Sequence, residues 1–315
     1  MKVLQVLTVV VVAIINSTNT SPLNDYRILF WNLENFFDSK DGGTCPSDAE
    51  FSAHGARHWT RRRYNAKCGA IAKTILWTGE ETGRLPEIVA VAEVENRKVL
   101  ADLTLNTPLR KADYGIVHYD SPDARGIDVA LLYRKPVFRL LDSSPLHIPG
   151  LTTRDILLCT LVSRTSPEDT LRILVNHHPS KYGGPSSAAR RKAAIARLKA
   201  ACDSLLELGA SRIILCGDFN DTPDNPLFDT LGFTNLAAPL ALRGEGTIRF
   251  SGKWELIDMF FVPPSLADST TMHILKPPFL LVRDNVHPGE KPFRTWSGPR
   301  YQGGVSDHLP ILLIF

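Results

Sequence analysis

Eight short apolar runs, separated by polar segments, dominate the pattern along the chain. They are RILFW (27–31), EIVAVA (87–92), GIDVALLYR (126–134), DILLCTLV (155–162), RILVN (172–176), RIILC (212–216), ELIDMFFV (255–262) and LPILLIF (309–315). Most are continuously apolar rather than alternating with polar residues, a pattern typical of strands that are covered on both faces. The chain is therefore predicted to be built on strands that lie between other layers.

Two further segments carry apolar residues at helical spacing. In residues 60–77 the apolar side chains recur at steps of four, three and four, and residues 186–208 repeat a similar rhythm. Each segment starts at a residue that can cap a helix and is followed or ended by a glycine: Thr60 and Gly79, and Ser186 or Ser187 and Gly209. Both helices are expected to lay one apolar stripe on a sheet.

The chain shows no internal repeat, no low-complexity tract and no Pro/Ser-rich linker between two halves, so residues 21–315 are predicted to form one domain. Two stretches, 39–60 and 276–304, are rich in Gly, Pro and charge and are predicted to be loops. Long loops of this kind are usually functional or disordered.

The first twenty residues, MKVLQVLTVVVVAIINSTNT, have the pattern of a secretory signal peptide: Lys2, an apolar stretch over 3–15, then small polar residues. The apolar stretch is shorter than the ~20 residues that a membrane-spanning helix needs. We expect residues 1–20 to direct export to the periplasm, the cell surface or the medium, with no transmembrane segment. A buried N-terminal strand or helix is the alternative.

The composition is that of an ordinary globular protein. Of 315 residues, 43% are hydrophobic and 22% are charged, so the chain can bury a substantial core. A formal net charge of +3 permits a polyanionic partner but does not require one, because that inference needs charge clustered on one face.

Five cysteines are present, and an odd number cannot all pair within one chain. Cys159 and Cys216 lie in apolar runs and are predicted to be buried as small hydrophobic residues. Cys45 and Cys68 flank a loop rich in Gly, Pro, Ser and Asp, which makes them the favoured pair in an oxidising compartment.

Polar side chains gather at the ends of five of the apolar runs. These clusters are WNLEN (31–35), EVEN (93–96), NHHPS (176–180), GDFND (217–221) and SDH (306–308). Each alone is ordinary turn chemistry, but together they would form a pocket of carboxylates, amides and two imidazoles. Such oxygen ligands suit Mg²⁺, Mn²⁺ or Ca²⁺ better than zinc, and a hard cation beside a carboxylate base and a histidine is equipped for phosphoester hydrolysis.

The ordered set W-N-x-E-N, A-E-x-E-N, V-N-H, G-D-F-N-D, I-D in a late strand and a terminal S-D-H-L-P resembles the endonuclease/exonuclease/phosphatase family, or deoxyribonuclease I-like superfamily, in a secreted bacterial-type form. The resemblance covers nearly all of the chain after the leader. It implies an α/β fold, a four-layer α/β/β/α sandwich of two mixed sheets with helices outside. This expectation agrees with the buried strands and amphipathic helices predicted above.

The matching positions imply three carboxylates on the metal side of the site. Glu93 is similar to the principal metal-binding glutamate of the family, and Glu34 to an acid near the metal. Asp307 resembles an acid that binds a second metal or orients the attacking water. The implied cofactor is Mg²⁺ or Mn²⁺, with Ca²⁺ as a further possibility.

The resemblance also implies the groups that act on the phosphate. Asp218 would orient or deprotonate the attacking water, and Asn220 and Asn32 would hold phosphate oxygens. His177 would donate to the phosphate, and His308 would bind it or assist the leaving group.

Two acids inside apolar runs need a separate explanation. A charge at Asp258 is costly in a strand unless it is paired, and a charged His308 would be a suitable partner. Asp128 would either orient His177 or only begin a strand, and the sequence does not decide between the two.

These features predict an exported, divalent-metal-dependent phosphoesterase, monomeric, that cleaves phosphodiesters in nucleic acid. One alternative is a phosphatase or phosphodiesterase acting on lipid head groups or sugar phosphates, because such an enzyme would share every catalytic residue. Another is a non-catalytic module that binds a phosphate ligand.

Overall fold

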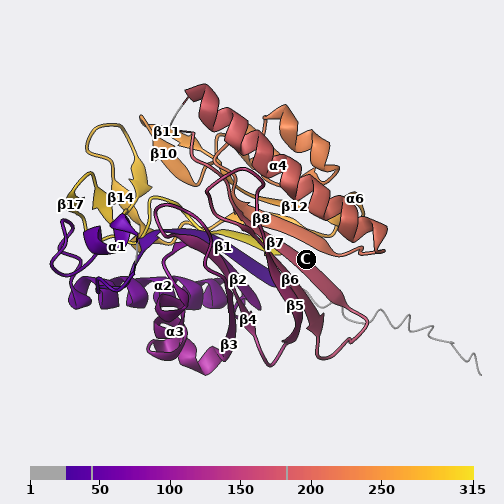
Figure 1. The fold of residues 1–315 in the computed structure, drawn as a ribbon, viewed down its shortest axis with the longest axis horizontal. Coiled ribbons are helices and arrows are strands. Elements are labelled where there is room, and N and C mark those ends of the chain that lie inside the picture. The colour runs from indigo at the N-terminus through magenta and orange to yellow at the C-terminus, as the bar shows by residue number, and fades with distance from the viewer. Residues whose placement is uncertain (1–25, 44, 182–183) are drawn as a thin grey trace, which may run out of the picture.

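Two mixed β-sheets pack face to face with helices on their outer faces, which is the four-layer α/β/β/α sandwich that the sequence predicts (Figure 1). The computed structural model describes residues 26–43, 45–181 and 184–315. The predicted signal peptide, 1–20, lies outside these ranges. None of the helices in the described ranges has the length and apolar character needed to cross a membrane.

The first sheet has six strands in the order β13-β18-β1-β2-β4-β3. Their bounds are β1 Arg27–Phe36, β2 Ile88–Val94, β3 Tyr114–His118, β4 Asp128–Arg134, β13 Thr271–Ile274 and β18 Ile311–Ile314. β1 and β2 run parallel, and the other neighbours are antiparallel. Helices α2 (Arg61–Glu81) and α3 (Arg97–Leu105) cover the outer face of this sheet (Figure 1).

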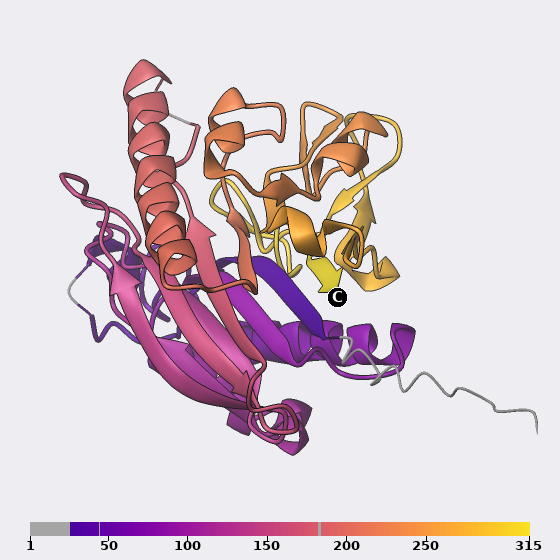
Figure 2. The same cartoon turned by 90° about the vertical axis from the view of Figure 1, so that its right-hand side faces the viewer.

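The second sheet also has six strands, in the order β5-β6-β7-β8-β12-β9. Their bounds are β5 Phe138–Leu146, β6 Ile156–Ser163, β7 Thr170–His177, β8 Ile213–Asp218, β9 Thr234–Asn235 and β12 Asp258–Val262. β7 and β8 form its parallel pair. The long helix α4 (Gly184–Glu207) lies along the outer face (Figure 2).

Shorter elements complete the fold around the rim of the sheets. The helices are α1 Pro46–Glu50, α5 Ala238–Leu242 and α6 Pro264–Ala267, and the 3-10 turns are Pro108–Ala112, Pro226–Leu231 and Pro278–Leu280. The two-stranded ribbons pair β10 (Ile248–Phe250) with β11 (Lys253–Glu255), β14 (Leu281–Arg283) with β15 (Glu290–Pro292), and β16 (Trp296–Ser297) with β17 (Arg300–Tyr301). The stretch 276–304 is therefore not a plain loop, because it carries two of these ribbons.

The continuous apolar runs are explained by two cores. Along β1, Ile28 and Phe30 face the second sheet, whereas Leu29 and Trp31 belong to the core between the first sheet and its helices. Because successive side chains of a strand point to opposite faces, a strand between two cores needs an apolar residue at every position.

The two predicted helices are present with shifted ends. Thr60 caps α2, as predicted, by accepting a hydrogen bond from the backbone of Arg63. The helix continues past Gly79, because this glycine packs against Leu85 rather than ending the helix. Helix α4 begins before the predicted serine caps and ends before Gly209, whose φ is +77°.

The cysteine pairing prediction was wrong. Cys45 and Cys68 are both free thiols. Cys68, on α2, is buried in the core between this helix and the first sheet, while the thiol of Cys45 lies 3.3 Å from the carbonyl oxygen of Arg125. Cys159 and Cys216 are fully buried, as predicted.

Candidate active site

The polar ends of four strands meet at one rim of the sandwich because of how those strands pair. β1 and β2 run parallel, and their regular pairing stops at Asn32 and Ala92, just before Glu34 and Glu93; β7 and β8 run parallel with His177 opposite Asp218. The antiparallel β12 begins where β8 ends, which places Asp258 opposite Asp218. Parallel pairing therefore brings together motifs that are far apart in the sequence.

Asp218 lies at the centre of this group and is almost completely buried. Its Oδ2 accepts a hydrogen bond from Asn32 at 3.1 Å and lies 3.6 Å from Nε2 of His177 and 3.8 Å from Nε2 of His308. Burial raises the pKa of Asp218 to about 7, with His308 opposing the shift and Asp258 adding to it. A carboxylate with a pKa in this range can accept a proton from water near neutral pH.

His308 and Asp258 form the contact that the sequence predicts. Nδ1 of His308 lies 2.8 Å from Oδ2 of Asp258, which also accepts a hydrogen bond from the hydroxyl of Thr247. Burial alone would lower the pKa of His308, but the charges of Asp258 and Asp218 and the hydrogen bond outweigh it and raise the pKa well above its ordinary value. The imidazole is therefore held in its charged form.

His177 is in the opposite state. Burial, followed by the charges of Arg154 and Arg125, lowers its pKa well below the ordinary value, so this imidazole is neutral. Its Nδ1 has no hydrogen-bond partner, and Asp128 instead binds Ser121 and His118. Of the two roles considered for Asp128, the structure shows the start of β4 and not the orientation of His177.

Glu93 is the side chain best placed to hold a divalent cation. One of its oxygens accepts a hydrogen bond from the backbone of Asn35 at 2.8 Å, while the other lies 3.8 Å from His177 and 3.9 Å from Arg125. An accessible carboxylate oxygen of this kind suits a hard cation, so the residues present fit Mg²⁺ or Mn²⁺. Asp218, Asp258 and His308 also lie within 4.8 Å of one another, but a charged His308 bonded to Asp258 has no free lone pair for a metal.

The other two acids predicted on the metal side have strong protein partners. The oxygens of Glu34 accept hydrogen bonds from the backbone N–H groups of Thr295 and Trp296, at 2.6 and 3.1 Å. Asp307 is bound by the guanidinium of Arg294 at 2.9 Å. Burial and the charge of Asp307 raise the pKa of Glu34 to about 7. Glu34 therefore anchors the 293–297 segment in addition to facing the site.

Backbone strain is concentrated at these residues. Of seven non-glycine residues with positive φ in the described ranges, four lie in the last residues of β1 and β2 or just after β8: Glu34 (45°), Asn35 (53°), Glu93 (60°) and Asn220 (50°). Such conformations cost about 1–3 kcal/mol each and persist where the surrounding structure enforces them, which is common at functional sites.

A cavity of about 370 Å³ opens over the group. It is lined by seven of the nine predicted site residues: Glu34, Glu93, His177, Asp218, Asn220, Asp307 and His308. The other two, Asn32 and Asp258, lie behind it, and each is hydrogen-bonded to a lining residue. All nine are therefore brought into one site.

A model of the endonuclease/exonuclease/phosphatase family matches residues 27–315. The chain belongs to this family. Its members are phosphoric ester hydrolases that use divalent metals, so the protein is an enzyme of this class, as the sequence predicts.

Solved structures show the same fold at low sequence identity. A Bacteroides thetaiotaomicron protein of this family has a TM-score of 0.58 and 16% identity, covering 92% of this chain and 98% of that one. The mannosyl-6-phosphatase of B. thetaiotaomicron has a TM-score of 0.58 and 15% identity over 92% and 99%. Humanized D. rerio TDP2 has a TM-score of 0.56 and 14% identity over 92% and 99%. No curated protein sequence matches the chain.

Several groups around this family site were not predicted from the sequence. The cavity is also lined by Arg125, Arg249, Phe250 and Arg294, which lie in segments that carry no recognisable motif. Buried Lys67 on α2 donates to the carbonyl oxygen of Glu34 and, at 2.9 Å, to the hydroxyl of Thr295. Lys67 lies on the apolar side of its helix, three residues after Tyr64. A lysine at such a position in the sequence indicates a buried charge that needs polar partners.

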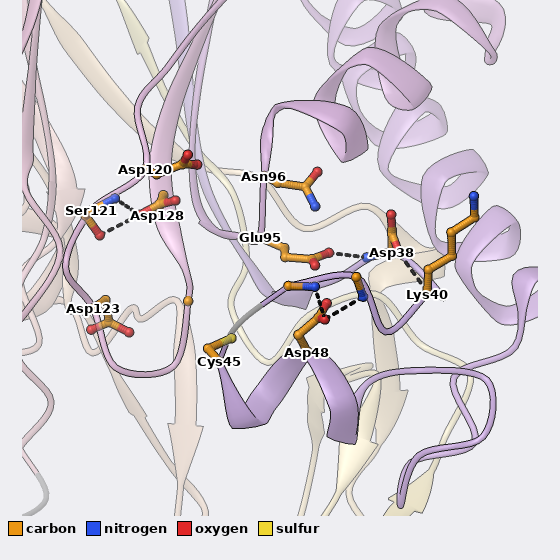
Figure 3. A pocket seen from close by; sticks show the side chains of 13 residues that line it. Asp38, Lys40, Cys45, Asp48, Glu95, Asn96, Asp120, Ser121, Asp123 and Asp128 are labelled. Atoms are coloured by element: carbon orange, nitrogen blue, oxygen red, sulfur yellow. Dashed lines mark hydrogen bonds between the residues drawn. The ribbon is translucent and has the colours of Figure 1, made fainter.

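A larger cavity of about 480 Å³ lies beside the site, between α1 and the loop that leads into β4 (Figure 3). Its wall carries six carboxylates: Asp38, Asp48, Glu95, Asp120, Asp123 and Asp128. Burial and a hydrogen bond with Asp48 raise the pKa of Glu95 to about 8. The predicted catalytic residues lie in the smaller cavity, so size alone does not identify the site.

Proposed function

We propose that this enzyme hydrolyses phosphodiester bonds in nucleic acid with the help of a divalent cation. The observation that carries the proposal is the meeting of Glu93, Asp218 and His308 in one cavity, although they come from three distant segments and from both sheets. Together they offer a cation site, a proton acceptor and a charged donor around a space that can hold a phosphate.

In this proposal each residue acts through the state that its surroundings impose. Asp218 accepts the proton of the attacking water, and Asn32 keeps the carboxylate oriented through the 3.1 Å hydrogen bond. His308, charged and fixed by Asp258, stabilises the negative charge that builds on the phosphate or the leaving oxygen. His177 and Asn220 contribute neutral contacts to phosphate oxygens. Mg²⁺ or Mn²⁺ held by Glu93, with Asp307 and Glu34 nearby, would neutralise phosphate charge and favour ionisation of the water.

Basic side chains on one side of the active-site cavity support a polyanionic substrate. An adjoining cavity of about 320 Å³ shares Arg249, Arg294 and Asp307 with the active-site cavity and adds Lys291 and His287, both of which lie beside Asp284. Basic groups next to a phosphate site attract a nucleic-acid backbone. A strand would therefore leave the site along the 284–297 segment.

A sugar-phosphate phosphatase is the second candidate, and the six-carboxylate cavity favours it. Carboxylates accept hydrogen bonds from sugar hydroxyls and repel a second phosphate. A lipid head group would use the same catalytic residues.

Activity against a panel of substrates tests the proposal. The mature chain would be incubated with Mg²⁺ or Mn²⁺ and with plasmid, linear DNA, RNA, a sugar phosphate or sphingomyelin, with a chelator as control. We expect cleavage of nucleic acid that the chelator abolishes and that Asp218→Asn and His308→Gln lose while keeping the wild-type circular dichroism spectrum. Release of phosphate from the sugar ester alone would favour the second candidate, and cleavage unaffected by both substitutions would refute the assignment of the site.

We further propose that residues 1–20 are a signal peptide, that the protein is exported and that it is a monomer. The sequence pattern of the leader supports the first two statements. Mass spectrometry of the protein recovered from a native host, together with its sedimentation coefficient, would test all three statements.

A further inference from the structure

Phe250 is an exposed aromatic residue at the mouth of the active site. Its surface is 57% exposed, yet the residue lines the same cavity as His308 and Glu93. It belongs to neither of the two apolar cores. Single exposed apolar residues are common on proteins. Phe250 differs from them in its position at the catalytic cavity and in the fixed hairpin that carries it.

The hairpin that carries Phe250 is firmly held. Its two-residue turn, Ser251 and Gly252, has positive φ at both positions, which matches the tight turns favoured between twisted strands. The guanidinium of Arg249 donates to the carbonyl oxygens of Gly252, Pro288 and Glu290, which ties the hairpin to the 284–292 segment. The backbone that carries the aromatic ring is therefore fixed before a ligand arrives, which lowers the entropic cost of binding.

The surroundings of the ring indicate what it would contact. Arg125 and Arg294 line the same cavity and supply positive charge, while Asp218 and His308 mark the position of the phosphate. A ligand that places a phosphate at these groups and a flat group at Phe250 combines a phosphoester with an adjacent planar ring. Nucleotides have this combination, and aromatic side chains stack on bases largely irrespective of sequence.

We propose that Phe250 is a stacking platform for the nucleobase next to the scissile phosphate, and thereby selects substrates that carry a base. The inference rests on the proposed nucleic-acid hydrolysis and extends it to a specificity residue. Because Phe250 packs in no core, its replacement leaves the fold and the catalytic groups intact.

The test compares two substrates that differ only in their bases. One is a short end-labelled oligothymidylate, and the other is an oligomer of the same length with abasic tetrahydrofuran units on the same phosphodiester backbone. kcat/KM is measured with Mg²⁺ or Mn²⁺ for the wild type, Phe250→Ala, Phe250→Leu and Phe250→Trp. Leu242→Ala is the matched control, since Leu242 is 90% exposed on α5 and lines none of the cavities described above.

We expect Phe250→Ala and Phe250→Leu to lower kcat/KM for oligothymidylate about tenfold or more, chiefly through KM, as loss of one base–aromatic stack predicts. Phe250→Trp should retain the activity, the abasic oligomer should be cleaved equally by all variants, and Leu242→Ala should behave as wild type. Equal losses on both substrates, or full activity of Phe250→Leu, would overturn the stacking role.

The same experiment separates this inference from the proposed function. If the wild type cleaves both oligomers, Asp218→Asn abolishes the cleavage and the Phe250 substitutions do not change it, nucleic-acid hydrolysis is supported and the stacking role of Phe250 is refuted. If the wild type cleaves neither oligomer but releases phosphate from a sugar ester, both the proposed function and the platform fail.

Discussion

Two imidazoles that approach the same oxygen of Asp218 are held in opposite protonation states by their immediate surroundings. His308 faces Asp258 and Asp218 and is kept charged, whereas His177 is buried near Arg154 and Arg125 and is kept neutral. Burial disfavours the charged form of both rings; at His177 the arginine charges add to this effect, whereas at His308 the charges of Asp258 and Asp218 and the hydrogen bond to Asp258 outweigh it. One residue type thus supplies two different hydrogen-bonding groups in one cavity.

Removing the charge of Asp258 should impair catalysis with little change in shape. We expect Asp258→Asn to lower kcat about 10²-fold or more, because His308 loses the partner that keeps it charged and oriented. Steady-state kinetics at saturating Mg²⁺ would measure the loss. Asp128→Asn is the matched control, since Asp128 is a buried carboxylate paired with His118 outside the catalytic cavity. Equal losses in the two variants would contradict the role given to Asp258.

His178 should make the protein sensitive to acid. Burial and the charges of Arg154 and Arg191 lower its pKa from 6.5 to about 3, and neither ring nitrogen has a hydrogen-bond partner. Between these values the unfolded chain binds a proton that the folded protein excludes. The part of the free energy of unfolding that depends on His178 is therefore fully present above about pH 6.5. It is lost as the pH drops toward 3, by up to about 1.4 kcal/mol per pH unit.

We expect His178→Phe to change the free energy of unfolding little at pH 8 and to flatten its decline at acid pH. The ring would still pack edge-on against Phe219, while two unpartnered polar atoms are removed. Urea unfolding at several pH values measures both effects. Because the pKa of His177 is also lowered, the free energy of unfolding of the variant should still fall with decreasing pH, but less steeply than in the wild type. An equally steep fall would show that His178 does not contribute.

At the scale of elements, strand ends are tied to one another by buried polar bridges. Arg154, which precedes β6, donates to the carbonyl oxygen of His178 at 2.8 Å and to Asp123 at 2.9 Å. The amide of Asn220 donates to the same carbonyl at 2.9 Å. Arg154 thus links the end of β7 to the loop that carries Arg125.

Breaking this bridge from one side should be more harmful than removing both partners. Arg154→Met removes the closest cation from the largely buried Asp123, leaving Arg125 at 3.9 Å, and also removes the donor to the His178 carbonyl oxygen; we expect it to lower the free energy of unfolding by about 3–5 kcal/mol. Adding Asp123→Leu should recover part of the loss. Chemical denaturation of both single variants and the double variant measures the coupling, and strictly additive effects would mean that the two side chains do not interact.

At the scale of the whole molecule, the site lies where the two sheets meet, and its acids repel one another. Glu93 comes from the first sheet and Asp218 from the second, and burial raises the pKa of Asp218. Functional sites often retain such unfavourable arrangements because the chemistry requires them. A bound cation would offset the repulsion and stabilise the folded state by mass action.

Divalent metal should therefore raise the melting temperature of the wild type. At a concentration about 100 times the dissociation constant, Mg²⁺ or Mn²⁺ should add about 2.7 kcal/mol. Glu93→Gln should abolish most of the gain, whereas Asp128→Asn, which alters the six-carboxylate cavity, should keep it. Thermal scans with and without metal measure the effect, and a gain that disappears only in Asp128→Asn would place the cation in the other cavity.

Much of the fold and of the site could be predicted because both depend on local pattern. The eight apolar runs are strands, and the polar clusters at their ends supply eight of the nine predicted site residues, while Asp258 lies inside one of the runs. Strand β5 was missed because its residues are mostly polar or half-exposed at the sheet edge, and α3 because it is short. The predicted helix end at Gly79 was wrong, because the local sequence does not show that Leu85 packs over this glycine.

The amino-acid sequence alone indicates which segments are buried strands and which chemical groups follow them, because apolar runs, helix caps and turn preferences act over a few residues. How those groups are used depends on tertiary contacts: Glu34 is bound by the backbone of residues 295 and 296, Arg294 holds Asp307, and Phe250 lines the catalytic cavity. These contacts join residues that are distant along the chain. Their geometry follows from how the two sheets pack, which no local pattern encodes.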